Sequence, residues 1–177
     1  MYRLVTFKEI VRIPPSYFGK KVSAGALDLL REQYERTVSK QHGIIVSLHD
    51  ARVTSRGKVV HGDGAVFCDV EFDALVFTPV VNEVIEGRVS ETVEFGAFVR
   101  LGPIDGLVHV SQIANDYFSY DKRTGALVGK NSKKALKKGE LVRGKIATIS
   151  LKDTIPNSKI ALTMRTEGLN KDTGAKQ

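Results

Sequence analysis

Apolar and polar residues alternate along residues 2–13 and again along residues 66–77. This period of two is typical of β-strands that bury one face. A third apolar run, residues 44–53, is long enough for a strand, although its pattern does not reveal which side chains are buried. The first part of the chain therefore predicts a small antiparallel sheet.

Between residues 13 and 44 the spacing of apolar residues changes to three and four. The stripe from Leu27 to Val38 indicates one amphipathic helix over residues 24–40. Ser23 is the expected N-cap of this helix, and Gly43 is the expected stop signal after it. Residues 1–80 are thus predicted to form an α+β domain, a small antiparallel sheet with one main helix.

Three glycines, Gly57, Gly62 and Gly64, interrupt the strand pattern in residues 55–64. Glycine adopts positive φ without steric cost, so this segment is expected to be a loop between two strands. Without further information, an ordinary hairpin connection is the favoured interpretation of these glycines.

From residue 82 onward, short strand candidates recur with glycines between them, and there is no convincing amphipathic helix. Five such strands are typical of a small OB-fold barrel, predicted here over residues 82–165. A polar insertion, residues 114–138, separates the third strand from the fourth, and residues 166–177 are expected to be a disordered tail. The strand candidates are residues 84–92, 95–101, 106–110, 141–151 and 159–164.

Composition narrows the class of protein. The 177 residues are 42% hydrophobic and 27% charged, the balance of a globular chain. No apolar run reaches the roughly 18 residues needed to cross a bilayer, and the N-terminus lacks a signal-peptide pattern. A single cysteine, Cys68, indicates a reducing compartment, so a cytoplasmic location is expected, or a nuclear one if the chain is eukaryotic.

Candidate catalytic chemistry is sparse. Cys68 shares an alternating strand face with Val66 and Val70, so a buried, inert thiol is the favoured interpretation. The four histidines lack metal-ligand spacing, and neither paired carboxylates nor a phosphate-binding loop can be identified. We therefore expect no catalytic residue, no metal and no cofactor.

The formal net charge is +7, and the basic residues are concentrated in one region. Residues 122–145 contain nine Lys and Arg and a single acid, Glu140. Such a patch favours a polyanionic partner, because neutralising phosphates releases counterions, although a solvated loop explains it equally well. Candidate phosphate contacts in this patch are Lys133, Lys134, Lys137 and Lys138.

Two aromatic residues and a histidine stand out in the barrel sequence. Phe95 and Phe98 are three residues apart and would face opposite sides of a regular strand, but Gly96 permits a bulge that brings both rings onto one surface. Exposed rings on a sheet are platforms for unstacked bases, and His109 on the next strand could add a flat group or a phosphate contact. Taken alone, the two phenylalanines are more simply explained as core residues.

The sequence around these residues resembles the S1 RNA-binding domain. The resemblance implies an OB-fold barrel in which Phe95, Phe98 and His109 form the surface for single-stranded RNA. Lys145 and Lys159, on the last two strands, become candidates for phosphate contacts. The matching segments are Phe95-Gly96-Ala97-Phe98-Val99 and Gly106-Leu107-Val108-His109-Val110-Ser111.

Over nearly its whole length, the chain also resembles the family of RNA polymerase subunits that comprises the archaeal E′ polypeptide and the seventh-largest subunit of eukaryotic RNA polymerase II. This combination of segments is more specific than the S1 motif alone, because it covers both predicted domains. The segments are Arg12-Ile13-Pro14-Pro15, Gly62-Asp63-Gly64-Ala65, Glu71-Phe72-Asp73, Tyr120-Asp121, Lys138-Gly139 and Ile160-Ala161-Leu162-Thr163-Met164-Arg165.

The family resemblance implies a non-catalytic stalk subunit of a DNA-dependent RNA polymerase. It implies a heterodimer with a small subunit-F-like protein, docking on the polymerase core through the N-terminal domain, and contact of the S1 domain with emerging single-stranded RNA. The docking residues would be Gly57, Gly62, Asp63 and Gly64. Two alternatives stay open: an S1-domain accessory factor of RNA decay or translation, and an assembly protein whose barrel no longer binds RNA.

Overall fold

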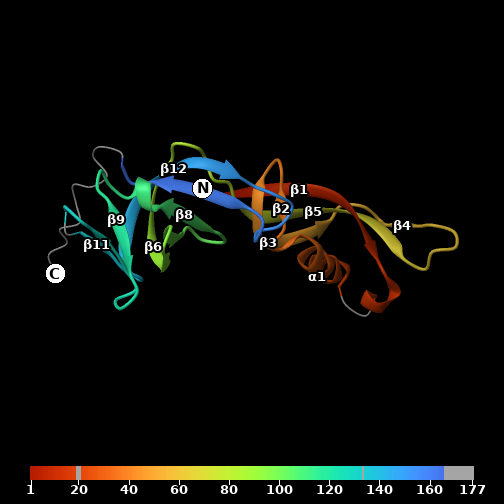
Figure 1. Cartoon of the computed structure of the whole chain (residues 1–177). Coiled ribbons are helices and arrows are strands. Elements are labelled where there is room, and N and C mark those ends of the chain that lie inside the picture. The colour runs from red at the N-terminus through yellow and green to blue at the C-terminus, as the bar shows by residue number, and fades with distance from the viewer. Residues whose placement is uncertain (19–20, 133, 166–177) are drawn as a thin grey trace, which may run out of the picture. The chain divides into compact units, whose positions relative to one another are not determined.

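The computed structural model describes residues 1–18, 21–132 and 134–165, and the chain forms two compact units (Figure 1). The first unit is Met1–Thr78, and the second begins at Pro79. The tail that the sequence predicts to be disordered, residues 166–177, lies outside the described residues. No helix in the described part of the chain is long and apolar enough to cross a membrane.

The first unit is an antiparallel sheet with one helix packed against it, as predicted (Figure 1). The strands lie in the order β1-β5-β3-β2, and β4 pairs with β5. A short 3-10 helix, η1 (Pro15–Tyr17), follows β1, which ends where Pro14 offers no N–H to a ladder. The strands are β1 (Tyr2–Ile13), β2 (Val38–Ser39), β3 (Gly43–Val53), β4 (Lys58–Val59) and β5 (Val66–Phe77).

Alternation along β5 builds the core of this unit. Val70, Phe72, Ala74 and Val76 are each at most 2% exposed and face the helix side of the sheet. The side chains between them, such as Glu71 and Asp73, lie on the other face. The alternating pattern of residues 66–77 therefore specifies which face of the sheet is buried.

The helix α1 spans Val22–Tyr34, and its Ala26 and Leu30 side chains are buried against the sheet. The prediction of a helix over residues 24–40 is wrong at its C-terminal end. Ser23 lies inside the first turn and does not cap it, and Gly43 begins β3.

Pairing with β3 ends the helix before the apolar stripe ends. Glu35 is extended and Arg36 has a φ of 63°, so the chain turns away directly after Tyr34. The N–H of Arg36 donates to the carbonyl oxygen of Ile45 (2.9 Å), and the N–H of Ile45 donates to that of Thr37 (3.0 Å). These bonds to β3 take the place of further helical bonds.

The second unit contains a closed five-stranded barrel in the order β12-β13-β8-β7-β6. Neighbouring strands are antiparallel except for β8 and β13, and pairing of β12 with β6 closes the barrel. The predicted five-stranded barrel is thereby confirmed. Its strands are β6 (Val84–Val93), β7 (Gly96–Arg100), β8 (Asp105–His109), β12 (Leu141–Ser150) and β13 (Lys159–Thr163).

The polar insertion between β8 and β12 is folded. A 3-10 turn, η2 (Val110–Gln112), leads into a three-stranded antiparallel sheet, which we call the insertion sheet. Phe118, Leu127 and Leu136 are buried in it, each at most 7% exposed. The insertion contains so few apolar residues that its sequence shows no strand pattern, and the sheet was therefore not predicted. Its strands are β9 (Phe118–Asp121), β10 (Ala126–Gly129) and β11 (Ala135–Leu136).

Candidate nucleic-acid interface

The outer face of β7 exposes an aromatic side chain. Ala97 and Val99 point into the barrel and are 0% and 1% exposed. Phe98 lies between them, so its side chain points outward, where it is half-buried. Phe98 is therefore not a core residue, although its sequence alone favours that interpretation.

Phe95 occupies the two-residue turn between β6 and β7 and is 52% exposed. Its ring meets that of Phe98 edge to face, with centroids 6.3 Å apart and planes at 86°. The rings share a surface because one belongs to a turn and the other to the outer face of a strand. Gly96 pairs regularly with Val93 and His109, so the bulge predicted at this glycine is wrong.

Gly96 is needed for a different reason. A Cβ at this position would lie 2.3 Å from the carbonyl oxygen of Val108 and 3.1 Å from the Cα of His109. Glycine therefore permits the close approach of β7 to β8. The N–H of Val110 also donates to the carbonyl oxygen of Phe95 (3.0 Å), so the end of β8 is held beside the turn that carries the ring.

His109 is exposed at the end of β8, opposite Gly96. Its Nδ1 accepts the N–H of Ser111 (3.3 Å) and lies 2.9 Å from the Ser111 hydroxyl. A neutral ring with Nδ1 as acceptor carries its proton on Nε2. The free edge of the imidazole is thus a donor suited to a phosphate oxygen or a base acceptor.

Two arginines that were not singled out in the sequence lie on the same outer face. Arg100 follows Phe98 by two residues, so both side chains point outward, and Arg88 on β6 is the cross-strand partner of Arg100. The Arg100 side chain is 71% exposed, with its Nε 4.0 Å from Asp105 Oδ1. The strand period of two was the signal that could have identified Arg100. We call Phe95, Phe98, Arg100 and His109 the aromatic face.

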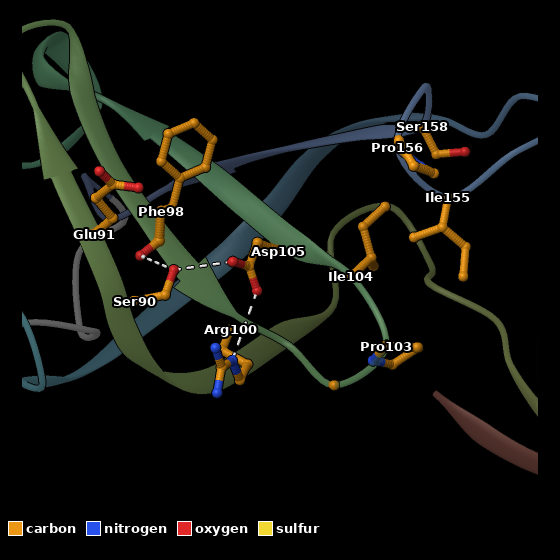
Figure 2. A pocket seen from close by; sticks show the side chains of 11 residues that line it. Ser90, Glu91, Phe98, Arg100, Pro103, Ile104, Asp105, Ile155, Pro156 and Ser158 are labelled. Carbon is orange, nitrogen blue, oxygen red and sulfur yellow. Dashed lines mark hydrogen bonds and ion pairs between the residues drawn. The ribbon is translucent and has the colours of Figure 1, made fainter. Parts of the chain in front are cut away.

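A hollow of about 730 Å³ opens along this face (Figure 2). Figure 2 shows the Phe98 ring and the Arg100 guanidinium toward one side, and apolar side chains of two loops toward the other. The Ser90 hydroxyl donates to Asp105 Oδ2 (2.9 Å), which fixes that carboxylate in the lining of the hollow. A flat ring, a cation and hydrogen-bond acceptors are the groups that hold a nucleotide. The lining residues outside the aromatic face include Glu91, Pro103, Ile104, Ile155 and Pro156.

Lys159 and Lys145 lie at different distances from this face. Lys159 is exposed and precedes Ile160, which pairs with Gly106 of β8, so it lies beside the strand that carries His109. Lys145 is half-buried on β12, which pairs with β13 and β6 but not with β8. One strand therefore separates it from β8, about 10 Å in all.

The basic residues of the insertion divide into two places. Lys137 and Lys138 are exposed in the turn before β12, which is tied to β6 by the Gly139 N–H donating to the carbonyl oxygen of Val89 (2.8 Å). Lys134 is exposed in the connection from β10 to β11. Lys133 lies outside the described residues. The described lysines of this set are therefore all exposed, on either side of the short strand β11.

In the first unit, residues 55–64, here called the tip loop, contain the short strand β4, paired with β5. Gly57 and Gly62 have φ of 79° and 88°, values that disfavour other residues, whereas Gly64 has no such requirement. A Cβ on Gly57 would lie 2.6 Å from Val66 Cγ1, but a Cβ on Gly62 would meet nothing within 4 Å. Only Gly57 is thus fixed by close packing.

Asp63 is the best-anchored residue of the tip loop. The Arg12 guanidinium donates to both of its carboxylate oxygens, Nε to Oδ2 at 2.9 Å and Nη2 to Oδ1 at 2.8 Å. The Ala65 N–H donates to Oδ1 as well (3.1 Å). The bonds from Arg12, followed by the bond from Ala65, lower the pKa of Asp63. This bidentate pair joins the end of β1 to the end of the tip loop.

Aliphatic side chains of the tip loop are uncovered. Val59 is 71% exposed and Val60 52% exposed, while Ile10 on β1 is 67% exposed. The glycines of this loop stand out in the sequence, whereas its valines were missed there. The adjacent Val59 and Val60 therefore offer apolar area that a protein partner could cover.

Nothing described in the chain has the arrangement of a metal site: no three His, Cys, Asp or Glu side chains of the described residues come together. Cys68 is 3% exposed, and burial raises the pKa of its thiol. A buried, protonated thiol is a poor nucleophile, which agrees with its interpretation as a core residue.

Comparison with known proteins divides the chain into the same two parts. Residues 8–64 match the SHS2 domain found in the N terminus of Rpb7p and Rpc25p, and residues 78–152 match the S1 RNA binding domain. The chain is 44% identical to DNA-directed RNA polymerase subunit Rpo7 of Sulfolobus acidocaldarius, over 97% of this chain and 93% of that one. It is 24% identical to DNA-directed RNA polymerase II subunit rpb7 of Dictyostelium discoideum, over 81% of this chain and 84% of that one.

A nuclease is also similar, but over a shorter stretch. Ribonuclease R of Vibrio cholerae is 39% identical over 48% of this chain, which is 11% of the nuclease. The likeness to the polymerase subunits extends over both units, whereas the likeness to the nuclease covers about half of the chain.

Proposed function

The chain belongs to the family of DNA-directed RNA polymerase subunit Rpo7, and we propose that it serves as a stalk subunit that binds emerging single-stranded RNA. In this proposal the chain carries out no chemistry itself. Its first unit docks on the polymerase core, and its S1 domain holds the transcript. A polymerase subunit works where the genome is transcribed, which in a cell without a nucleus is the cytoplasm.

The outward position of Phe98 carries the RNA-binding part of the proposal. Its ring lies against that of Phe95, with His109 at the end of the neighbouring strand and Arg100 two residues along the same face. Bases stack on such rings whatever their identity, and cations beside them neutralise phosphates. Lys159, Lys137 and Lys138 would extend the basic surface, and Lys145 would lie at its edge.

The tip loop supports docking on the polymerase core. The Arg12–Asp63 pair holds one end of the loop, while Val59 and Val60 remain exposed. A braced loop loses little conformational entropy when it binds, and exposed valines supply apolar area for a partner to cover. Asp63 would act by shaping the loop, together with Gly57, Gly62 and Gly64.

We further propose a heterodimer with a small subunit-F-like protein. The first unit has 78 residues, and a domain of this size buries a smaller fraction of its surface than a larger domain does. Leu4, 66% exposed on the edge strand β1, lies outside the tip loop and is available to such a partner. Polymerase docking and pairing would then use different parts of the same unit.

Purification of the tagged chain from its native cells, followed by mass spectrometry, tests this proposal. We expect the polymerase core subunits and one small subunit in the eluate, and cross-linking should attach nascent RNA to the second unit. Recovery of an RNA-decay nuclease or of ribosomal components without polymerase would favour the alternative of an S1-domain accessory factor.

A further inference from the structure

Tyr117 is an exposed aromatic residue that the aromatic face does not include. It lies just before β9 and is 69% exposed, more than Phe95 at 52%. The Lys130 ammonium lies 4.9 Å from the centre of its ring. Single-stranded nucleic acids bind to such a pair of groups, because a base stacks on the aromatic ring and the cation neutralises a phosphate.

Asp116 holds this pair in place. Its carboxylate accepts the Ser132 hydroxyl (2.7 Å), the Ser132 N–H (2.7 Å), the Tyr117 N–H (2.6 Å) and the Asn131 N–H (3.1 Å). These bonds, with the Ser132 hydroxyl first, lower the pKa of Asp116 to about 2. The Lys130 N–H also donates to the carbonyl oxygen of Tyr117 (3.0 Å), so the two segments are locked together.

Gly129 leaves room for the hydrogen bonds between Asp116 and Ser132. A Cβ there would lie 2.5 Å from Ser132 Oγ and 2.7 Å from Asp116 Oδ2. Any other residue at position 129 would displace the carboxylate that joins the two segments. The presentation of Tyr117 and Lys130 is therefore built into the insertion sheet and does not depend on one flexible side chain.

The charge around Tyr117 is suited to a polyanion. Lys130 lies beside the ring, and Lys134, two residues after Ser132, is exposed. Four donors surround the Asp116 carboxylate and partly offset its negative charge. A basic or apolar protein surface would be a poorer match for an exposed ring beside two lysines.

The opposite end of the insertion sheet lies next to the aromatic face. Lys122 Nζ is 3.3 Å from Glu94 Oε1, and the Thr92 hydroxyl donates to the carbonyl oxygen of Gly125 (2.6 Å). The β9–β10 turn is therefore fastened to the β6–β7 hairpin, whose turn carries Phe95. Tyr117 lies at the other end of β9, about 16 Å along the strand.

From this arrangement we propose that Tyr117 and Lys130 form a second contact point for single-stranded RNA, reached by a strand that leaves the aromatic face and follows the insertion sheet. The inference rests on the proposed RNA binding and extends it, because it names where the RNA goes beyond Phe95. It predicts that long oligonucleotides gain affinity from Tyr117 and that short ones do not.

The test compares RNA oligonucleotides of about 4 and about 16 nucleotides, the range of site sizes of OB-fold proteins. Binding to the full-length chain is measured by fluorescence anisotropy for Tyr117→Ser, Tyr117→Phe and Lys130→Gln. We expect Tyr117→Ser to weaken binding of the long RNA about 5-fold or more and to leave the short RNA unchanged. Tyr117→Phe keeps the ring and should bind like the wild type. Lys58→Gln, an exposed lysine of the first unit, is the control for loss of one charge.

The outcomes separate the inference from the proposed function. If Phe95→Ala/Phe98→Ala abolishes binding but Tyr117→Ser binds the long RNA normally, the second contact point is refuted and the proposed function stands. Wild-type protein that binds neither RNA would overturn both. If Tyr117→Ser keeps RNA affinity but loses a protein subunit from the purified complex, the surface is a protein contact and the inference is wrong.

Discussion

The outer face of the barrel and the tip loop are both uncovered, but different side chains build them. The aromatic face offers the rings of Phe95 and Phe98 with Arg100 beside them, whereas the tip loop offers the aliphatic Val59 and Val60. The second unit is also the more basic of the two. Residues 1–78 carry 11 basic and 9 acidic residues, and residues 79–177 carry 16 and 11.

In the proposed function, this difference lets one chain serve two kinds of partner. A nucleic acid supplies flat bases and a repeating negative charge, so flat groups and dispersed cations bind it without a fixed register. A protein surface requires apolar area in a defined shape, and the Arg12–Asp63 pair supplies that definition at the tip loop. The four predictions that follow test this difference, in order of decreasing expected effect.

Replacing both phenylalanines of the aromatic face should have the largest effect. Phe95→Ala/Phe98→Ala removes two stacking platforms, which should weaken binding of single-stranded RNA by about 2–6 kcal/mol. The melting temperature should change little, because neither ring fills the barrel core. Val99→Ala, 1% exposed on the same strand, is the control and should lower the melting temperature while RNA affinity of the folded protein is kept. A double variant that melts as early as Val99→Ala would show that the rings are structural.

Substitution of Gly62 should break docking without breaking the fold. A valine at a φ of 88° is strained by about 1–2 kcal/mol, so a loop that must keep this conformation when bound should dock about 5- to 30-fold more weakly. A pull-down of polymerase core with the heterodimer measures the loss. Gly125→Val is the matched control, because Gly125 also has positive φ and open space but belongs to the second unit. Equal binding of Gly62→Val and wild type would contradict the assignment of the tip loop.

Neutralising the insertion lysines should flatten the salt dependence of RNA binding. For every phosphate that Lys134, Lys137 or Lys138 no longer neutralises, the slope of log affinity against log salt should decrease by about 0.7. Titrations at several salt concentrations with all three changed to Gln give this slope, and Lys58→Gln is the control in the other unit. An unaltered slope would assign these lysines to solvent or to a protein partner.

The smallest expected effect is a local pH response at the tip loop. Asp63 has a lowered pKa, so its bonds to Arg12 and Ala65 persist above the ordinary Asp value and are lost as pH falls through the lower folded value. Arg12→Gln removes the largest cause of the shift, so the loss should move to higher pH, toward about 4. The amide chemical shift of Ala65, followed by NMR during acid titration, measures it. The amide of Thr54 bonds to a backbone carbonyl and should not respond. Identical Ala65 titrations in the two proteins would show that Arg12 does not hold the carboxylate.

Much of the fold follows from local pattern. The alternation of residues 2–13 and 66–77 corresponds to β1 and β5, and the five strand candidates of the barrel are all present. Alternation with a period of two shows which side chains share a face of their own strand. A few neighbouring residues are enough to recognise this pattern. The S1-like motif likewise predicts a shared surface for Phe95, Phe98 and His109, and the two rings meet with centroids 6.3 Å apart.

The tertiary structure decided which elements end early and which residues meet. The apolar stripe of α1 runs on to Val38, yet the helix ends at Tyr34 because the next residues bond to β3. Asp63 binds Arg12, 51 positions away in the sequence, and Gly96 is required by the backbone of β8. Local pattern fixes the direction of a side chain relative to its own strand. Its neighbours across the sheet depend on pairing between distant segments, and only the folded chain sets that register.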